Sequence, residues 1–268
     1  MKNEVRQLAF VAVCEYTAAF LVTVLLHETA HALMALAVGT HPVLHNSYVD
    51  NPPVAAGQQV LIALAGPGFS LAQGLVFLAL ARRGRGTGPG ALFGLYLGVF
   101  GLINFLGYVM TGPFVPYGDI GQAEKMLRVP MAAAIGAAIA AAIALTIIVQ
   151  RTAPLFMRFV PAAGPEAVPA SAKAHKRLYL RALLLWPWLL GSVLVTAVAW
   201  PLPTLISLVY PPMSSMVLGA AFGAAVGRPE LLGAPAAPGV LRASPWGPML
   251  MLGAVAAVFR LLSAGVRL

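Results

Sequence analysis

Long, continuous apolar segments recur along the whole chain and restrict its fold more than any other feature. Each is close to the ~20 residues that an α-helix needs to cross the hydrocarbon core of a membrane. Charged residues make up only 9% of the sequence, against roughly 25% in soluble domains. The apolar runs do not alternate with polar residues, as barrel strands would. We therefore expect an all-α polytopic membrane protein. The six predicted spans are residues 8–38, 58–81, 91–110, 130–149, 178–200 and 246–262.

Residues 201–226 are also apolar, but four prolines interrupt them. Proline removes a backbone donor and kinks or breaks a helix. The segment fits three descriptions: a kinked seventh span, a re-entrant segment or a helix that lies in the membrane interface.

The basic residues predict an orientation. With six spans and the N-terminus inside, 13 of the 17 Lys and Arg residues fall on the inner side, which favours a cytoplasmic N-terminus in the plasma (inner) membrane. We attribute the net charge of +9 to orientation and to contact with the lipid bilayer, not to nucleic-acid binding. The four remaining basic residues, expected outside, are Lys125, Arg128, Arg228 and Arg242.

The first apolar segment contains the sequence His27-Glu28-Thr29-Ala30-His31. Two imidazoles four residues apart share one face of a helix and can bind one zinc ion, and the glutamate between them is placed to act as a general base. Polar and charged groups inside a membrane helix are costly, so such a cluster indicates a functional site. The motif predicts metal-dependent hydrolysis within the bilayer.

A catalytic zinc site takes three protein ligands and keeps one position open, so a third ligand is expected. The position six residues after His31 is Ala37, which excludes the metzincin arrangement. Glu15 lies on the same helix about three turns from His27, roughly 18 Å away, too far to share a metal. The residues that remain as third-ligand candidates are Asp50, Asp119, Glu124, His41 and His45.

Four elements together resemble the site-2 protease family of intramembrane zinc metalloproteases. They are residues 27–31, the segment 65–70 with its Gly-Pro pair in the next span, Asn104 in the third span, and Gly118-Asp119 after it. The resemblance implies a three-helix metalloprotease-like core. Two positions differ from the family pattern: Ser70 stands where the family has Asn, and Ile120 separates Asp119 from the next glycine.

The resemblance also implies a role for each matched residue. It makes Glu28 the general base toward a zinc-bound water, and it makes the protein an intramembrane zinc metalloendopeptidase that cuts membrane-embedded substrates. The implied Zn²⁺ ligands are His27, His31 and Asp119, and the implied substrate-positioning residues are Asn104, Gly66 and Pro67.

We expect three regions: a catalytic core over residues 1–129, a fourth span and polar linker over residues 130–177, and a C-terminal helical membrane extension over residues 178–268. The expected partners are a membrane-protein substrate, the lipid bilayer and a membrane partner subunit. Two other functions stay open. One is a non-catalytic membrane subunit or scaffold of a larger complex that retains the metal-site fold. The other is a metal-dependent membrane hydrolase that acts on a lipid or a small molecule.

Overall fold

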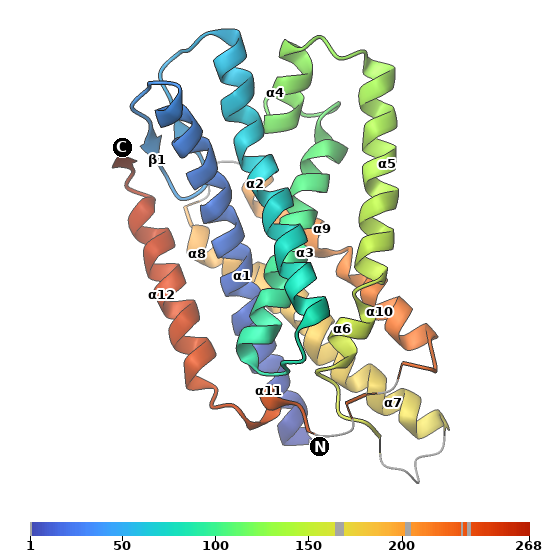
Figure 1. Ribbon diagram of the computed structural model, residues 1–268. Coiled ribbons are helices and arrows are strands. Elements are labelled where there is room, and N and C mark those ends of the chain that lie inside the picture. Colours follow the sequence, from blue (N-terminus) through green and yellow to red (C-terminus); the bar gives the residue numbers. More distant parts are fainter. Residues whose placement is uncertain (1, 164–168, 202–204, 232, 235–236) are drawn as a thin grey trace.

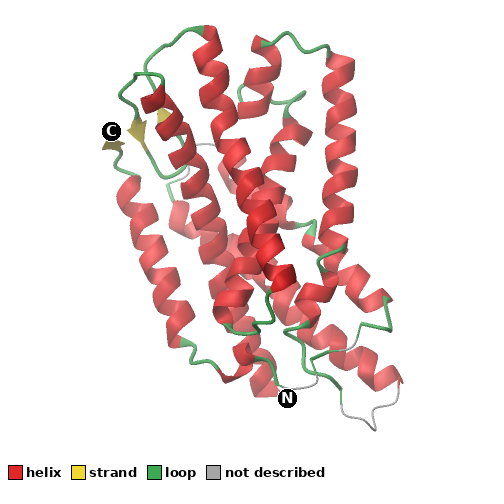
Figure 2. Cartoon of the chain, viewed as in Figure 1, coloured by secondary structure: helices red, strands yellow, loops and turns green. Residues whose placement is uncertain are grey.

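The computed structural model describes residues 2–163, 169–201, 205–231, 233–234 and 237–268, and most of these residues are helical (Figure 1). Six helical segments are long and apolar enough to cross a membrane, which confirms the predicted fold class. Figure 2 shows that strands are confined to a small sheet beside the C-terminus. In this sheet, β1 (Val43–Leu44) pairs antiparallel with both β2 (Val49–Asp50) and β3 (Val266–Arg267).

Three long helices form the centre of the molecule: α1 (Lys2–Ala37), α2 (Ala56–Arg83) and α3 (Pro89–Thr111). They pack against one another, and α5 (Met131–Gln150) lies against the outer side of α3 (Figure 1). Local sequence fixes the turn between α2 and α3. Gly84 follows the last residue of α2, and α3 begins with a proline, whose missing N–H costs nothing at a helix start.

Close approach of backbones holds α2 against α3. A Cβ built on Gly101 would lie 2.5 Å from the backbone nitrogen of Gly74, so the two helices touch where side chains are absent. Small residues allow such contacts between membrane helices. A buried amide adds a polar link, because Gln73 Nε2 donates to Thr23 Oγ1 on α1 at 2.8 Å and to the Leu97 carbonyl on α3 at 3.0 Å. These contacts fix the relative positions of α1, α2 and α3.

The second half of the chain wraps around this centre. Its fifth candidate span, Ala170–Ala199, runs through α7, two π-helical stretches and α8. Near its end, Arg260 Nη1 donates to the Val198 carbonyl at 3.5 Å. The elements of this half are α6 (Ala153–Met157), α7 (Pro169–Leu180), η1 (Arg181–Leu185), η2 (Pro187–Gly191), α8 (Ser192–Ala199), α9 (Leu205–Ser215), α10 (Leu218–Gly227), α11 (Gly239–Arg242) and α12 (Trp246–Leu262).

The sixth candidate span is Leu208–Gly227, which falls in the segment that the sequence left open. The expected last span, Trp246–Leu262, is a shorter apolar helix of 17 residues. Helix continues through Pro211 and Pro212 as far as Ser215, and α10 begins three residues later. Trp188 Nε1 donates to the Pro212 carbonyl at 2.7 Å, which gives this interrupted backbone a partner. Of the three descriptions left open for residues 201–226, the kinked span fits the described part.

At the end of the molecule that holds the N-terminus, hydrogen bonds connect segments that are far apart in the sequence. Gln7 donates to the Ala243 carbonyl at 2.9 Å, the Gly239 amide donates to Thr87 Oγ1 at 2.9 Å, and Lys176 donates to the Arg228 carbonyl at 2.9 Å. The C-terminus lies at the other end, beside β1 (Figure 1).

This arrangement corrects the expected positions of four arginines. The kinked span adds a crossing, so Arg228 and Arg242 lie at the N-terminal end, not opposite it. By the same reasoning Arg260 and Arg267, expected at the N-terminal end, belong to the opposite end with β3. The two pairs exchange places, so 13 of the 17 basic residues still fall at the N-terminal end.

Candidate metal centre

Helix α1 presents two histidines toward the interior of the molecule. His27 and His31 are one helical turn apart, and their Nε2 atoms lie 3.0 Å from each other. Both side chains are buried, with 2% and 6% of their surface exposed. Glu28, between them in the sequence, is 7% exposed. The motif therefore lies inside the helical bundle.

Asp119 reaches these histidines from 92 residues further along the chain. It is the first residue of α4 (Asp119–Met126), a short helix that packs against α2. The turn before α4 is tight: a Cβ on Gly121 would lie 2.2 Å from the Val115 carbonyl oxygen and 2.7 Å from that of Gly112. Only glycine fits at position 121. A hydrogen bond also links α4 to α2, because Gln59 Nε2 donates to Gln122 Oε1 at 3.3 Å. The turn and the helix contact together place Asp119.

The three side chains converge on one point. Asp119 Oδ2 lies 2.9 Å from His27 Nε2 and 3.3 Å from His31 Nε2. Bonds of ~2.0–2.2 Å in a tetrahedral site separate ligand atoms by about 3.4 Å, close to these distances. Among the residues that the structure describes, this is the one group of three or more His, Cys, Asp or Glu side chains placed to hold a metal ion.

Gly66 on α2 leaves space beside both ligand nitrogens. A Cβ at this position would lie 2.3 Å from His31 Nε2 and 2.7 Å from His27 Nε2. A metal ion bonded to these nitrogens needs comparable room. Two imidazoles, one carboxylate and this space fit a metal ion, and three protein ligands leave a further coordination position for water or substrate.

Helix α2 also orients the two imidazole rings. His27 Nδ1 lies 3.1 Å from Ser70 Oγ, and His31 Nδ1 lies 2.6 Å from the Ile62 carbonyl oxygen. A carbonyl only accepts, so His31 Nδ1 carries the hydrogen. With a metal bound, Nε2 would be unprotonated and its lone pair would face the metal position. Such outer partners fix the tautomer and ring orientation of metal-binding histidines. The ring of Tyr108 on α3 stacks on His27, with centroids 5.1 Å apart and planes 7° from parallel.

The electrostatics of Asp119 suit a cation site. Burial by itself raises the pKa of its carboxyl group, but the hydrogen bonds with His27 and His31 outweigh burial and hold the pKa well below its usual range. Asp119 therefore stays negatively charged at neutral pH, ready to neutralise part of the charge of a divalent ion.

The other third-ligand candidates lie elsewhere. His45 and Asp50 interact with each other, Nε2 to Oδ2 at 3.4 Å, beside the small sheet. His41 is exposed in the loop that precedes β1. Glu124 on α4 approaches Gly112, on the side where that helix meets the end of α3. Of the five candidates, only Asp119 joins the two histidines.

The three residues expected to position a substrate lie on the two helices that flank the metal centre. Gly66 and Pro67 are buried in α2, and the proline leaves the Ala63 carbonyl without its helical donor. Asn104 is buried on α3, one turn before Tyr108 and on the same face. Its Oδ1 has no hydrogen-bond partner among the described residues.

Sequence reasoning missed Ser70 and Tyr108 as parts of the site. Ser70 carried a signal, because it follows the Gly-Pro pair by three residues. Tyr108 carried no sequence signal beyond its helical spacing from Asn104.

Comparisons of the chain with protein-family models, with curated proteins and with solved structures found no match.

Proposed function

We propose that this protein is an intramembrane zinc metallopeptidase that hydrolyses peptide bonds of membrane-embedded substrates. One observation carries the proposal: His27, His31 and Asp119 converge inside a bundle of membrane-spanning helices, and Glu28 directly follows the first of them. The sequence resemblance to the site-2 protease family supports the same reading.

Zinc is the metal that best suits this donor set. Two imidazole nitrogens and one carboxylate oxygen are ligands of known catalytic zinc sites, in which three protein ligands leave a fourth position open. When bound, zinc would polarise the carbonyl of the scissile peptide and acidify a water molecule beside it.

The residues of the chain supply the remaining functions. The Glu28 carboxylate accepts the proton of the attacking water and passes it to the departing amine, as a general base and then a general acid. Ser70 and the Ile62 carbonyl hold the two imidazoles in orientation. Asn104 offers its side-chain amide to the backbone of an unwound substrate segment, consistent with its unpartnered Oδ1.

The distribution of basic residues supports a cytoplasmic N-terminus. The metal centre lies in the C-terminal half of α1, nearer the end of the molecule that carries few basic residues. With this orientation, the cleaved bond lies in the outer half of the plasma membrane.

A non-catalytic membrane subunit that retains the metal-site fold is the second candidate. The observation in its favour is Ser70, which replaces the asparagine of the site-2 protease pattern and whose hydroxyl is engaged with His27. A subunit of this kind would still need the metal for stability but would not need Glu28.

Reconstitution with a single-span substrate separates these functions. Wild-type protein and Glu28→Gln are placed in liposomes with the substrate, and zinc content and cleavage are both measured. A protease predicts that Glu28→Gln keeps zinc and loses about 10²–10⁴-fold in cleavage rate. Glu124→Gln is the matched control and keeps both. A wild-type protein that binds zinc but cleaves nothing, together with full rescue of a deletion strain by Glu28→Gln, would support the scaffold.

A further inference from the structure

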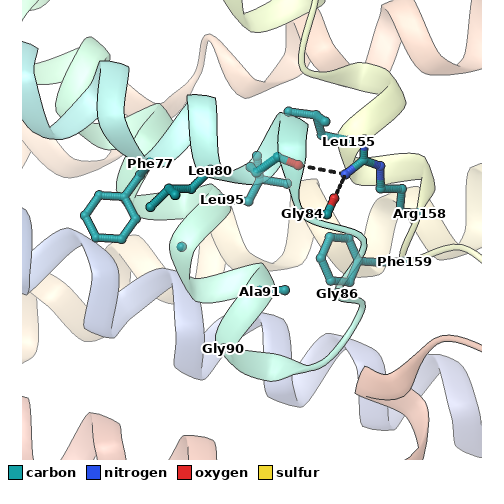
Figure 3. A pocket seen from close by; sticks show the side chains of 12 residues that line it. Phe77, Leu80, Gly84, Gly86, Gly90, Ala91, Leu95, Leu155, Arg158 and Phe159 are labelled. Atoms are coloured by element: carbon teal, nitrogen blue, oxygen red, sulfur yellow. Dashed lines mark hydrogen bonds between the residues drawn. The ribbon is translucent and has the colours of Figure 1, made fainter.

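An apolar cavity lies at the N-terminal end of the molecule, away from the metal centre. It has a volume of about 210 Å³ and lies between the last turns of α2, the first turns of α3 and the α6 region (Figure 3). Phe77, Leu80, Leu155 and Phe159 contribute much of its wall. An apolar cavity of ~150 Å³ already accommodates benzene, so this one has room for a hydrocarbon segment.

Missing side chains create this space. Gly90 and Gly94 lie one turn apart on α3, and both line the cavity. A Cβ on Gly90 would meet no atom within 4 Å, and a Cβ on Gly94 would come no closer than 3.6 Å to Phe77. Helix packing therefore does not require glycine at either position, in contrast to Gly74 and Gly101. The two glycines instead keep the cavity open.

Arg158 forms the polar part of the cavity lining. Its Nη1 donates to the carbonyls of Ala81 and Gly84, both at 2.7 Å, at the end of α2 (Figure 3). The other guanidinium N–H groups of Arg158 form no hydrogen bond with a described residue, and no described carboxylate lies within 4 Å of the guanidinium. A buried or half-buried guanidinium prefers a bidentate anionic partner such as phosphate.

A second, wider hollow of about 580 Å³ adjoins the first, and Arg158 lines both. Arg85 lines the second hollow as well, and Arg82 and Arg83 end α2 close by in the sequence. Glu230 also lines it, but forms no ion pair with either lining arginine. The site thus joins an apolar cavity to a positively charged hollow at the ends of membrane-spanning helices.

We propose that this joined cavity binds one anionic glycerophospholipid. A segment of one acyl chain occupies the apolar cavity between α2 and α3, and the phosphate of the headgroup lies between Arg158 and Arg85. A free phosphate ion would leave the apolar cavity unused. A zwitterionic lipid gains less from the arginines, because its headgroup carries a compensating positive charge. Anionic headgroups are attracted to basic residues next to membrane spans.

Native mass spectrometry of the full-length protein in detergent tests this site. Dioleoyl phosphatidylglycerol is titrated against dioleoyl phosphatidylcholine and against inorganic phosphate. Gly90→Leu fills the cavity, and Arg85→Gln removes a headgroup charge without touching the hydrogen bonds of Arg158. Gly136→Leu on α5 is the matched control, since a Cβ there also meets nothing within 4 Å.

We expect wild-type protein to bind phosphatidylglycerol about tenfold more tightly than phosphatidylcholine. Gly90→Leu lowers the affinity for phosphatidylglycerol about tenfold. Arg85→Gln reduces the ratio of the affinities for phosphatidylglycerol and phosphatidylcholine about fivefold. Gly136→Leu changes neither the affinity nor the ratio. Equal binding of the two lipids, or unchanged binding in Gly90→Leu, would overturn the proposal. Inorganic phosphate that binds as tightly as phosphatidylglycerol and displaces it would also overturn the proposal, because the site would then recognise the headgroup alone. If Gly90→Leu does not fold, the lipid preference of Arg85→Gln decides the question by itself.

Discussion

Ser70 Oγ on α2 lies 3.1 Å from Nδ1 of His27 on α1, so the position that differs from the site-2 protease pattern is occupied by a partner of a metal-site histidine. Ser70 is fully buried, and no water can take over this hydrogen bond without entering the helix interface. The serine at this position is therefore placed to orient the ring of His27 from within the bundle.

This contact predicts the behaviour of Ser70→Ala. Loss of the hydroxyl frees the ring of His27 to rotate and removes the partner of Nδ1, so we expect zinc affinity to fall by about 10–100-fold. Competition with a chelator of known zinc affinity measures the change. Ser214→Ala on α9 is the control, because among the described residues its hydroxyl bonds to the Pro211 carbonyl of its own helix and to no part of the metal centre. An unaltered zinc affinity in Ser70→Ala would mean that the packing of α2 alone orients His27.

The glycines on either side of Pro67 form a matched pair. A methyl group on Gly66 would lie 2.3 Å from His31 Nε2, whereas a methyl group on Gly68 meets nothing within 4 Å. We expect Gly66→Ala to abolish zinc binding and Gly68→Ala to keep it, with both variants inserted in the membrane. Zinc content of the purified proteins distinguishes them. Equal zinc in both variants would place the metal away from α2.

The sequence predicts what depends on local pattern. Apolar length located five of the six spans, and the spacing of His27 and His31 placed both side chains on one face of α1. Residues 201–226 stayed undecided between three descriptions because four prolines interrupt them. The tertiary hydrogen bond from Trp188 to the Pro212 carbonyl, which gives this backbone a partner, cannot be read from local sequence.

Contacts between helices lie beyond such local patterns. Asp119 stayed one of five candidates until the resemblance selected it, because its place depends on the tight turn at Gly121 and on the contact of α4 with α2. The stacking of Tyr108 on His27 depends on the relative rotation of α1 and α3, which packing sets. Sequence spacing within one helix does not contain that information.

Asp119 is predicted to contribute the third metal bond. Asp119→Asn keeps the size of the side chain but removes the charge, so we expect zinc affinity to fall by more than the 10–100-fold typical of an outer partner. Asp50→Asn, which alters the other described Asp–His pair, should leave zinc binding unchanged. Zinc titration by calorimetry of both variants gives the comparison. Tight zinc binding in Asp119→Asn would assign the third bond to another group.

Packing of α2 against α3 should be sensitive to one added methyl group. Gly101→Ala places a Cβ 2.5 Å from the backbone of Gly74 and forces the helices apart, at a cost of about 1–3 kcal/mol of unfolding free energy. Gly107→Ala on the same helix meets nothing within 4 Å and should be neutral or slightly stabilising. Unfolding of the purified proteins in detergent, followed by circular dichroism, compares the two. Similar stability of both variants would show that α2 and α3 can separate without cost.

Acid should destabilise the metal-free protein through Asp119. Hydrogen bonds with the histidines hold the pKa of this carboxyl below its usual value, although burial opposes the shift. A carboxyl whose pKa is lower in the folded than in the unfolded state adds stability above its unfolded pKa of ~3.9 and loses that contribution as the pH falls further. We expect wild-type protein to unfold at a higher temperature than Asp119→Asn at pH 6, with the difference shrinking below about pH 4. Melting curves of both proteins in a chelator, from pH 6 to pH 3, test this. A difference that grows toward low pH would mean that Asp119 is protonated in the folded state.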